Sequence, residues 1–302
     1  MKIGNFADSK TKVVNHKLTF VIKIYSCMMQ WLRNIFDFYL DASVHVALSV
    51  GCLMGITAFL LDITVSFSLL GFTFFSTIVC YNFVKYGVEA KKYLIVSNIY
   101  HKYIQFFSFL CFIGALYFLF ALHYKIWIAI LFLSLISTLY AIPFLPHAKN
   151  LRSLGGFKIY VVALVWAGFT IVLPVLDADI PMSWDTNVLF LQRFVLVVIL
   201  LLPFEIRDLQ WDDVQLKTLP QVLGIRKTKT LGVILTSIFF ALTFFKDTIS
   251  QVELVMRLIL GIVFWFLLLS KNNFQAKYLA SFWVEGIPIC WYGLFVVVNG
   301  YF

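Results

Sequence analysis

The stretch NVLFLQRFVLVVILLLPF, residues 187–204, decides the class of fold. Arg193 is its only charged side chain, and the rest is almost entirely aliphatic or aromatic. A helix of about twenty apolar residues crosses a hydrocarbon core of about 30 Å. The stretch therefore predicts a helix that spans a membrane.

The composition extends this prediction to the whole chain. Of the 302 residues 62% are hydrophobic and 13% are charged, and the mean hydropathy is +0.92. A soluble globular domain carries about 25% charged residues, so this composition excludes that class. The net charge of +9 is typical of loops that face anionic lipid headgroups. We therefore expect membrane lipids, and no nucleic acid, as partners.

Further apolar stretches predict an all-α polytopic protein with nine transmembrane helices. The predicted spans are residues 43–61, 64–82, 104–122, 126–143, 157–176, 187–204, 230–245, 254–270 and 278–299. Residues 1–42 form a separate amino-terminal segment with an interfacial helix, because charged residues interrupt its apolar pattern. Residues 43–302 form the transmembrane domain. Arg193 and Arg257 lie close enough to helix ends for their side chains to reach the interface.

The distribution of positive charge predicts the topology. With a cytoplasmic amino terminus, 20 of the 24 Lys and Arg residues fall on the inner side. Positively charged loops resist translocation, so this orientation is favoured. We expect an integral protein of the bacterial inner (plasma) membrane with its amino terminus in the cytoplasm.

The chemically informative segment is PFEIRDLQWDDVQLKTLPQVLGIRKTK, residues 203–229. Four carboxylates fall within nine residues of it: Glu205, Asp208, Asp212 and Asp213. If the helix continues, the first three share one face and repel each other unless a cation lies between them. Mg²⁺ binds through one or two carboxylates and bridges to phosphates. A solvated loop whose charges neutralise one another is an equally good reading.

Two loops carry a resemblance to a known family. Arg207-Asp208-Leu-Gln-Trp-Asp212, then Lys217-Thr-Leu-Pro220 and Leu223-Gly224, resembles the second aspartate-rich motif of the UbiA superfamily of intramembrane prenyltransferases. Leu139-Tyr140-Ala-Ile-Pro143, followed by Lys149 and Arg152, is similar to the family's Tyr-x-x-Pro and basic loop. The family's nine helices with polar cytoplasmic loops also match the predicted layout.

The first motif of the family, Asn-Asp-x-x-Asp, is degenerate in this chain. Asn82 keeps the asparagine, whereas Phe83 and Tyr86 occupy the aspartate positions. Only Glu89 offers a carboxylate nearby, and Lys85 offers a positive charge that can contact phosphate directly. Half of the metal cage that the family uses is therefore missing.

The resemblance implies Mg²⁺-dependent transfer of an isoprenoid chain from a prenyl diphosphate to a lipophilic acceptor, such as an aromatic or quinone precursor. It implies catalytic roles for Asp208, Asp212 and Asn82, and metal ligation by Asp208, Asp212, Glu205 and Asp213. Candidate substrate contacts are Lys149, Arg152, Arg207, Lys217, Tyr140, Lys85 and Glu285. An aromatic-lined pocket, with Trp166 and Tyr140 as candidates, would stabilise an allylic cation.

Glu285 is a candidate on its own account, because it lies inside the ninth predicted span. An ionisable side chain within a bilayer is costly and is a functional hypothesis by default. Gly286 and Pro288 predict an irregular backbone there, with the carboxylate facing a cavity; pairing with a neighbouring helix is the alternative. Two other functions stay open: a catalytically lapsed relative that binds or carries a lipid or isoprenoid, and a membrane transporter.

Overall fold

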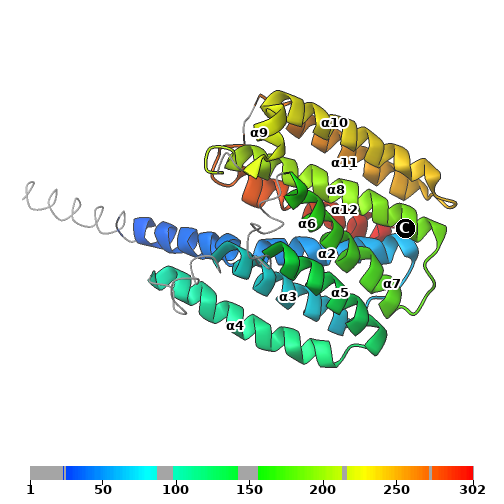
Figure 1. Cartoon of the computed structure of the whole chain (residues 1–302), viewed down its shortest axis with the longest axis horizontal. Helices are drawn as coiled ribbons and strands as arrows, with labels where there is room; N and C mark the ends of the chain where they lie inside the picture. The colour runs from blue at the N-terminus through cyan, green and yellow to red at the C-terminus, as the bar shows by residue number, and fades with distance from the viewer. Residues whose placement is uncertain are drawn as a thin grey trace, which may run out of the picture.

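The protein is a bundle of helices in the part that the structure, a computed structural model, describes: residue 23 and residues 25–86, 98–141, 156–212, 216–271 and 274–301. A first helix, residues 25–41, projects from one end of the bundle (Figure 1). The α-helices that follow are α2 (Val44–Leu61), α3 (Phe67–Tyr86), α4 (Ile99–Phe120), α5 (Tyr124–Ala141), α6 (Phe157–Ala167), α7 (Leu173–Asp177), α8 (Trp184–Asp208), α9 (Leu219–Leu223), α10 (Ile225–Ala241), α11 (Gln251–Leu269) and α12 (Ile287–Tyr301). The π-helical segments η3 (Gly168–Val172) and η6 (Leu279–Val284) join α6 to α7 and precede α12, and a 3₁₀ turn, η5 (Leu242–Phe245), ends α10.

The predicted all-helical membrane class is confirmed. Eight helical segments of the described residues are long and apolar enough to cross a membrane, and Tyr124–Leu139 is a shorter apolar helix. The boundaries differ where a side chain caps a helix. Asn98 accepts a hydrogen bond from the backbone N–H of Tyr100, so α4 begins at Ile99 and not near residue 104. Ser183 caps α8 in the same way, so this helix begins at Trp184, three residues ahead of the predicted start of that span.

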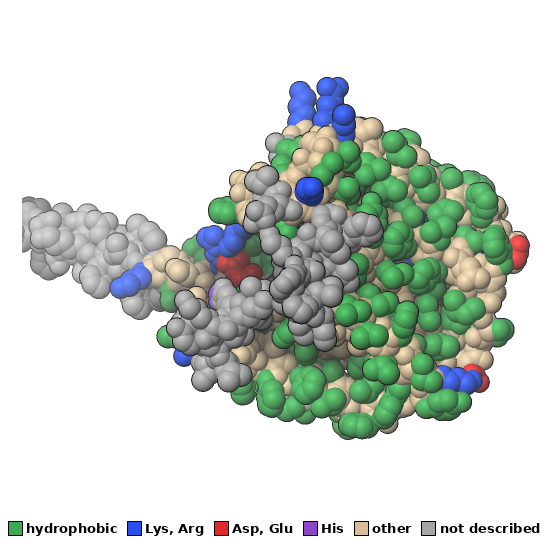
Figure 2. Space-filling model, viewed as in Figure 1, with side chains coloured by type: hydrophobic (Ala, Val, Ile, Leu, Met, Phe, Trp, Pro, Cys, Tyr) green, Lys and Arg blue, Asp and Glu red, His purple; other side chains and the backbone are tan. Residues whose placement is uncertain are grey.

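Helix α8 lies at the centre of the bundle and packs between α6 and α10 (Figure 1). Its most apolar window is 72% buried, whereas that of α4 is only 17% buried. The main core joins α8 to α2, α11 and η6 through residues such as Leu53, Leu196, Phe264 and Val284. Figure 2 shows a face made mostly of hydrophobic side chains, with charged groups near its margins. Such a surface is suited to lipid contact.

Arg193 does not reach the interface as the sequence predicted. It is 2% exposed, and its guanidinium donates to Leu53 O at 2.8 Å and to Thr57 Oγ1 at 3.1 Å. Thr57 Oγ1 in turn donates to Thr170 O at 2.7 Å. Pro174 has no N–H for that carbonyl, so the threonine hydroxyl satisfies it. A buried polar network therefore binds α2, η3 and α8 together.

Arg257, the other arginine predicted to reach the interface, is also buried, at 1% exposed. Its guanidinium pairs with Glu253 at 2.5 Å and donates to Thr243 Oγ1 at 3.0 Å. Lys246 Nζ contacts both oxygens of the same carboxylate, at 2.8 and 2.9 Å. The cluster Lys246–Glu253–Arg257 thus fixes the end of α10 and η5 against α11. The prediction was wrong for both arginines, because each is buried by packing and bonded to polar groups inside the protein.

Gly232 on α10 packs tightly against side chains of α8 and α11. A Cβ at this position would lie 2.8 Å from Leu268 and 2.9 Å from Leu202, and both leucines are fully buried. We expect Gly232→Val to destabilise the protein by about 1–3 kcal/mol through overpacking. The matched control is Gly261→Val on α11, where the nearest atom to a Cβ is 3.9 Å away. Thermal unfolding in one detergent compares them, and equal melting temperatures would contradict the tight packing at Gly232.

Candidate ligand cavity

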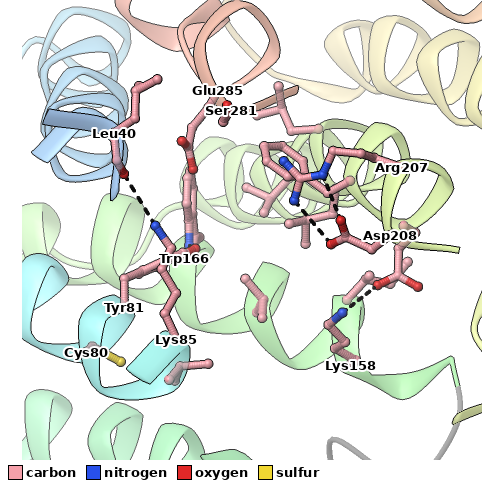
Figure 3. A pocket seen from close by; sticks show the side chains of 18 of the residues that line it. Leu40, Cys80, Tyr81, Lys85, Lys158, Trp166, Arg207, Asp208, Ser281 and Glu285 are labelled. Carbon is pink, nitrogen blue, oxygen red and sulfur yellow. Dashed lines mark hydrogen bonds and ion pairs between the residues drawn. The ribbon is translucent and has the colours of Figure 1, made fainter. Parts of the chain in front are cut away.

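A cavity of about 600 Å³ opens between the first helix, α3, α6, α8 and η6. It has an apolar wall and a rim of charged side chains, which come from the first helix, α3, α6, α8 and the residues on either side of η6 (Figure 3). The apolar lining consists of Val84, Ile159, Val161, Val162, Val165, Trp166, Val197, Leu200, Leu201 and Phe204, with Leu40 beside them. The indole N–H of Trp166 donates to Tyr81 Oη at 2.8 Å, which fixes the orientation of the ring.

Four basic side chains line the cavity, and three of them pair with a carboxylate. Lys158 lies 3.0 Å from Glu205, Arg207 binds Asp208 at 2.7 and 3.2 Å, and Lys277 binds Asp37 at 2.9 and 3.0 Å. The fourth, Lys85, instead donates to two neutral oxygens, Ser43 Oγ at 3.0 Å and Leu40 O at 3.4 Å. Lys85 is thus the basic group at the rim with no carboxylate bonded to it among the described residues.

The corner that holds Lys85 is built around Ser43. This residue adopts a left-handed conformation, with φ of 62°, between the first helix and α2. Its hydroxyl donates to Asn82 Oδ1 at 2.7 Å, and Asn82 Nδ2 donates to Ala42 O at 3.1 Å and Ser108 Oγ at 2.8 Å. Asn82 is 4% exposed and is not among the residues that line the cavity. Its amide joins α2, α3 and α4, and its predicted assistance to a metal stays a prediction.

The acidic segment after the sixth predicted span is only partly gathered at the cavity. Helix α8 continues past residue 204 to Asp208, and both Glu205 and Asp208 line the cavity. Asp212 follows in a turn beyond the end of α8. Its N–H donates to Asp208 O at 2.9 Å, but Asp212 is not among the residues that line the cavity. Asp213 lies outside the described residues.

The described residues do not form a metal cage by themselves. Within that part of the chain, no group of three or more His, Cys, Asp and Glu side chains is placed to hold a metal ion. Glu205 and Asp208 are each bonded to a base, and a metal ion would have to compete with those bases. The arrangement as it stands does not fit a preformed Mg²⁺ site, and Mg²⁺ dependence stays a prediction.

The Lys-Thr-Leu-Pro stretch starts a helix. Thr218 and Gln221 form a capping box at the start of α9, with Pro220 in its first turn. Gly224, with φ of 78°, then links α9 to α10 in a conformation that favours glycine. Lys217 is exposed and does not line the cavity. Of the other predicted contacts, Lys149, Arg152 and the side chain of Tyr140 lie outside the described residues.

Several cavity residues escaped the sequence reasoning. Lys158 and Lys277 lie at the starts of two predicted spans. That position, on the predicted cytoplasmic side, was the only feature of the sequence that could have indicated them. Asp37 accepts hydrogen bonds from Lys277 and from the hydroxyl of Tyr278 at 2.7 Å. Partial burial opposes ionisation of Asp37, but these two donors hold the pKa of its carboxyl below the usual value. The bonds tie the end of the first helix to the segment before η6.

Glu285 lines the cavity directly after the π-helical segment η6 (Figure 3). His45 Nε2 and Phe282 O lie 3.0 Å apart, and Ser49 Oγ donates to the backbone carbonyl of Glu285. A Cβ at Gly286 would lie 2.6 Å from Phe282 O and 3.1 Å from His45 Nε2, so only glycine fits without movement. The expected irregular backbone is confirmed. Among the described residues, the Glu285 carboxylate has no ion-pair partner.

The comparisons with known proteins agree with this architecture. No protein-family model and no curated protein matches the chain. Its structure is similar to that of a UbiA homolog from Archaeoglobus fulgidus, with a TM-score of 0.51 and 14% sequence identity. The match covers 86% of this chain and 96% of the homolog. The fold is therefore UbiA-like.

Proposed function

Starting from this UbiA-like fold, we propose that the protein binds a prenyl diphosphate in its cavity and transfers the isoprenoid chain to a lipophilic acceptor. The acceptor class that we propose is an aromatic or quinone precursor. The observation that carries the proposal is the cavity itself, in which an apolar wall and a charged rim meet. An amphiphile with a hydrocarbon tail and an anionic head has the complementary shape and charge.

The apolar wall supports binding of the tail. Pockets for small ligands measure about 300–1,000 Å³ and are lined mainly by apolar and aromatic groups. The aliphatic side chains of α6 and α8 form such a lining around Trp166. An aromatic ring face attracts a cation, so the fixed indole is suited to stabilise the allylic cation that develops as the chain leaves.

The rim supports binding of the head. Lys85, Lys158 and Arg207 come from three helices and line the same cavity. As the allylic carbon–oxygen bond breaks, its electron pair stays on the diphosphate, and preorganised positive groups stabilise that charge. Lys85 is the base most available to the diphosphate. Within the described part of the chain no carboxylate is bonded to it, so it need not give up an ion pair to bind the ligand.

Mg²⁺, if bound, would supply further positive charge to the leaving group. Its candidate ligands are Asp208, Asp212, Glu205 and Asp213. Glu205 and Asp208 would have to exchange a bonded base for the ion. Lys85 stands beside the degenerate first motif, and it supplies there part of the charge that a second ion would provide.

The second candidate is a lapsed relative that binds or carries an isoprenoid lipid. The observation in its favour is that Phe83 and Tyr86 replace the two aspartates of the first motif, while three of the four rim bases are already neutralised. Such a protein would bind the same ligand in the same cavity without breaking it.

Binding and turnover of a labelled prenyl diphosphate test the proposal. We expect the purified protein in nanodiscs to bind tritiated geranylgeranyl diphosphate saturably, and chelation of Mg²⁺ to weaken that binding. With a lipid extract of the producing cells as acceptor source, label should move into an uncharged lipid. Val162→Trp, which fills the apolar wall, should abolish both.

The outcomes separate the two candidates. Binding without transfer would support the carrier and overturn the transferase. Absence of saturable binding by the wild-type protein would overturn both. Unchanged binding in Val162→Trp would show that the ligand occupies another site.

A further inference from the structure

We infer that Glu285 is the proton acceptor of the transfer reaction, and that the acceptor substrate is one that loses a proton on alkylation, such as a phenol. The inference rests on the proposed function and deepens it by naming a residue and a class of acceptor. The similarity of fold does not assign this role to Glu285. The role is inferred from which carboxylates of the cavity already have bonded partners.

Five described carboxylates line the cavity, and four of them are engaged. Asp37 holds Lys277 and Tyr278, Glu205 holds Lys158, and Asp208 holds Arg207. Asp41 accepts a hydrogen bond from the hydroxyl of Tyr100 at 2.9 Å. Of these five, only Glu285 has no side chain bonded to either carboxylate oxygen among the described residues. It is the acid side chain most available to a bound molecule.

The backbone around Glu285 is irregular and is held rigidly by contacts from α2. An ionisable group inside an apolar span is unfavourable, and π-helical segments of this kind occur often at functional sites. Contacts from α2, through His45 and Ser49, fix the carbonyls of Phe282 and Glu285 at the end of this segment. The close fit at Gly286 leaves the segment little freedom. The carboxylate is therefore presented to the cavity from a rigid support.

Glu285 lies beside the basic groups of the cavity. Lys85 and Arg207 line the same cavity, and their positive charges act on this carboxylate. Figure 3 shows Glu285 on the wall of the cavity that also carries Lys85, Trp166 and Arg207. A bound acceptor can thus lie between the carboxylate and the allylic carbon, with the diphosphate held by the rim bases.

The reaction balances without another reagent. The carbon–oxygen bond of the prenyl diphosphate breaks, and its electron pair leaves with the diphosphate. A ring carbon or oxygen of the acceptor forms the new bond to the allylic carbon. The proton that this atom loses passes to the Glu285 carboxylate, and no oxidant or reductant is consumed. An acceptor with no proton to lose would gain nothing from Glu285.

Three variants test the role against a structural one. Glu285→Gln keeps the size of the side chain but cannot accept the proton, so transfer should fall roughly 10²–10⁴-fold, the usual contribution of a positioned base. Binding of tritiated geranylgeranyl diphosphate should stay within about twofold of wild type, because the head and tail contacts remain. Glu285→Asp should restore part of the rate. Ser281→Ala is the matched control and should behave as wild type, because Ser281 lies one helical turn before Glu285, in η6, and also lines the cavity.

The dependence of the transfer rate on pH separates a proton acceptor from a residue that only supports the structure. Wild-type transfer should rise with pH as a single group ionises, and the Glu285→Gln profile should lose that step. The groups that face or adjoin Glu285 are Lys85, Arg207, Tyr39 and His45. None of these four is changed by the substitution, so a step that persists in Glu285→Gln would belong to one of them and would overturn the inference.

The remaining outcomes are distinguishable from failure of the proposed function. Wild-type protein that binds no prenyl diphosphate overturns the proposed function, and wild-type protein that binds without transfer overturns both transfer and the role of Glu285. If wild type transfers and Glu285→Gln transfers equally fast, only the inference fails. Equal loss of binding and transfer in Glu285→Gln would make Glu285 a structural or head-group residue, which also overturns it.

Discussion

Replacing Glu253 with alanine is expected to lower the free energy of unfolding by about 3–5 kcal/mol, the usual effect of breaking a buried ion pair. Glu253 is 2% exposed and is the shared partner of Lys246 and Arg257, which are 7% and 1% exposed. Its removal leaves two buried cations near each other with no carboxylate between them. Thermal unfolding and denaturant titration in the same detergent measure the loss.

The surface pair Lys125–Asp179 provides the matched control. Its atoms lie 2.6 Å apart, but the side chains are 45% and 78% exposed. Solvent screens such pairs, so Asp179→Ala should leave the melting temperature nearly unchanged. Glu253→Leu should recover little stability, because the two cations remain. A mild effect of Glu253→Ala, similar to that of Asp179→Ala, would mean that water reaches the cluster.

Replacing Lys85 with methionine is expected to weaken binding of geranylgeranyl diphosphate roughly 10–150-fold. A hydrogen bond to a charged group contributes about 1.5–3 kcal/mol, which corresponds to that range of dissociation constants. Methionine keeps the length and apolar stem of lysine, so the corner around Ser43 should stay packed. Equilibrium binding of the tritiated ligand measures the change.

Lys277→Met is the control for the Lys85 experiment. Lys277 lines the same cavity, but its side chain is 56% exposed and is held by Asp37. We expect a much smaller loss of affinity for this variant. Equal effects of the two substitutions would contradict a specific role for Lys85 and would indicate a general effect of rim charge.

The fold was accessible from the sequence because the bilayer restricts the chain so strongly. Apolar length alone located the spans, since only helices satisfy their own backbone hydrogen bonds there. The continuation of α8 to Asp208 was only a condition of the prediction, which placed the end of that span at residue 204. Helix ends were less accurate, because caps such as Asn98 depend on one local hydrogen bond.

The site was only partly accessible, because sequence patterns give residue types and not their partners. Glu205, Arg207, Asp208, Lys85 and Glu285 were expected at a site and do line one cavity. The burial of Arg193 and Arg257 was missed, since the carbonyl that Arg193 binds belongs to Leu53, 140 residues away. Likewise, nothing in the sequence around Asn82 indicates that its amide is used to join three helices.

The mixture of bases and acids around the mouth has a consequence for how a ligand arrives. Lys85, Lys158, Arg207 and Lys277 stand among Asp37, Asp41, Glu205, Asp208 and Glu285, so opposite charges nearly cancel. Such a rim exerts little electrostatic steering, and free phosphate compounds in the aqueous phase would meet it no faster at low ionic strength. Capture then depends on partitioning: a molecule concentrated in the bilayer by its own tail encounters the opening often, and exchange of salt-bridge partners decides whether it stays.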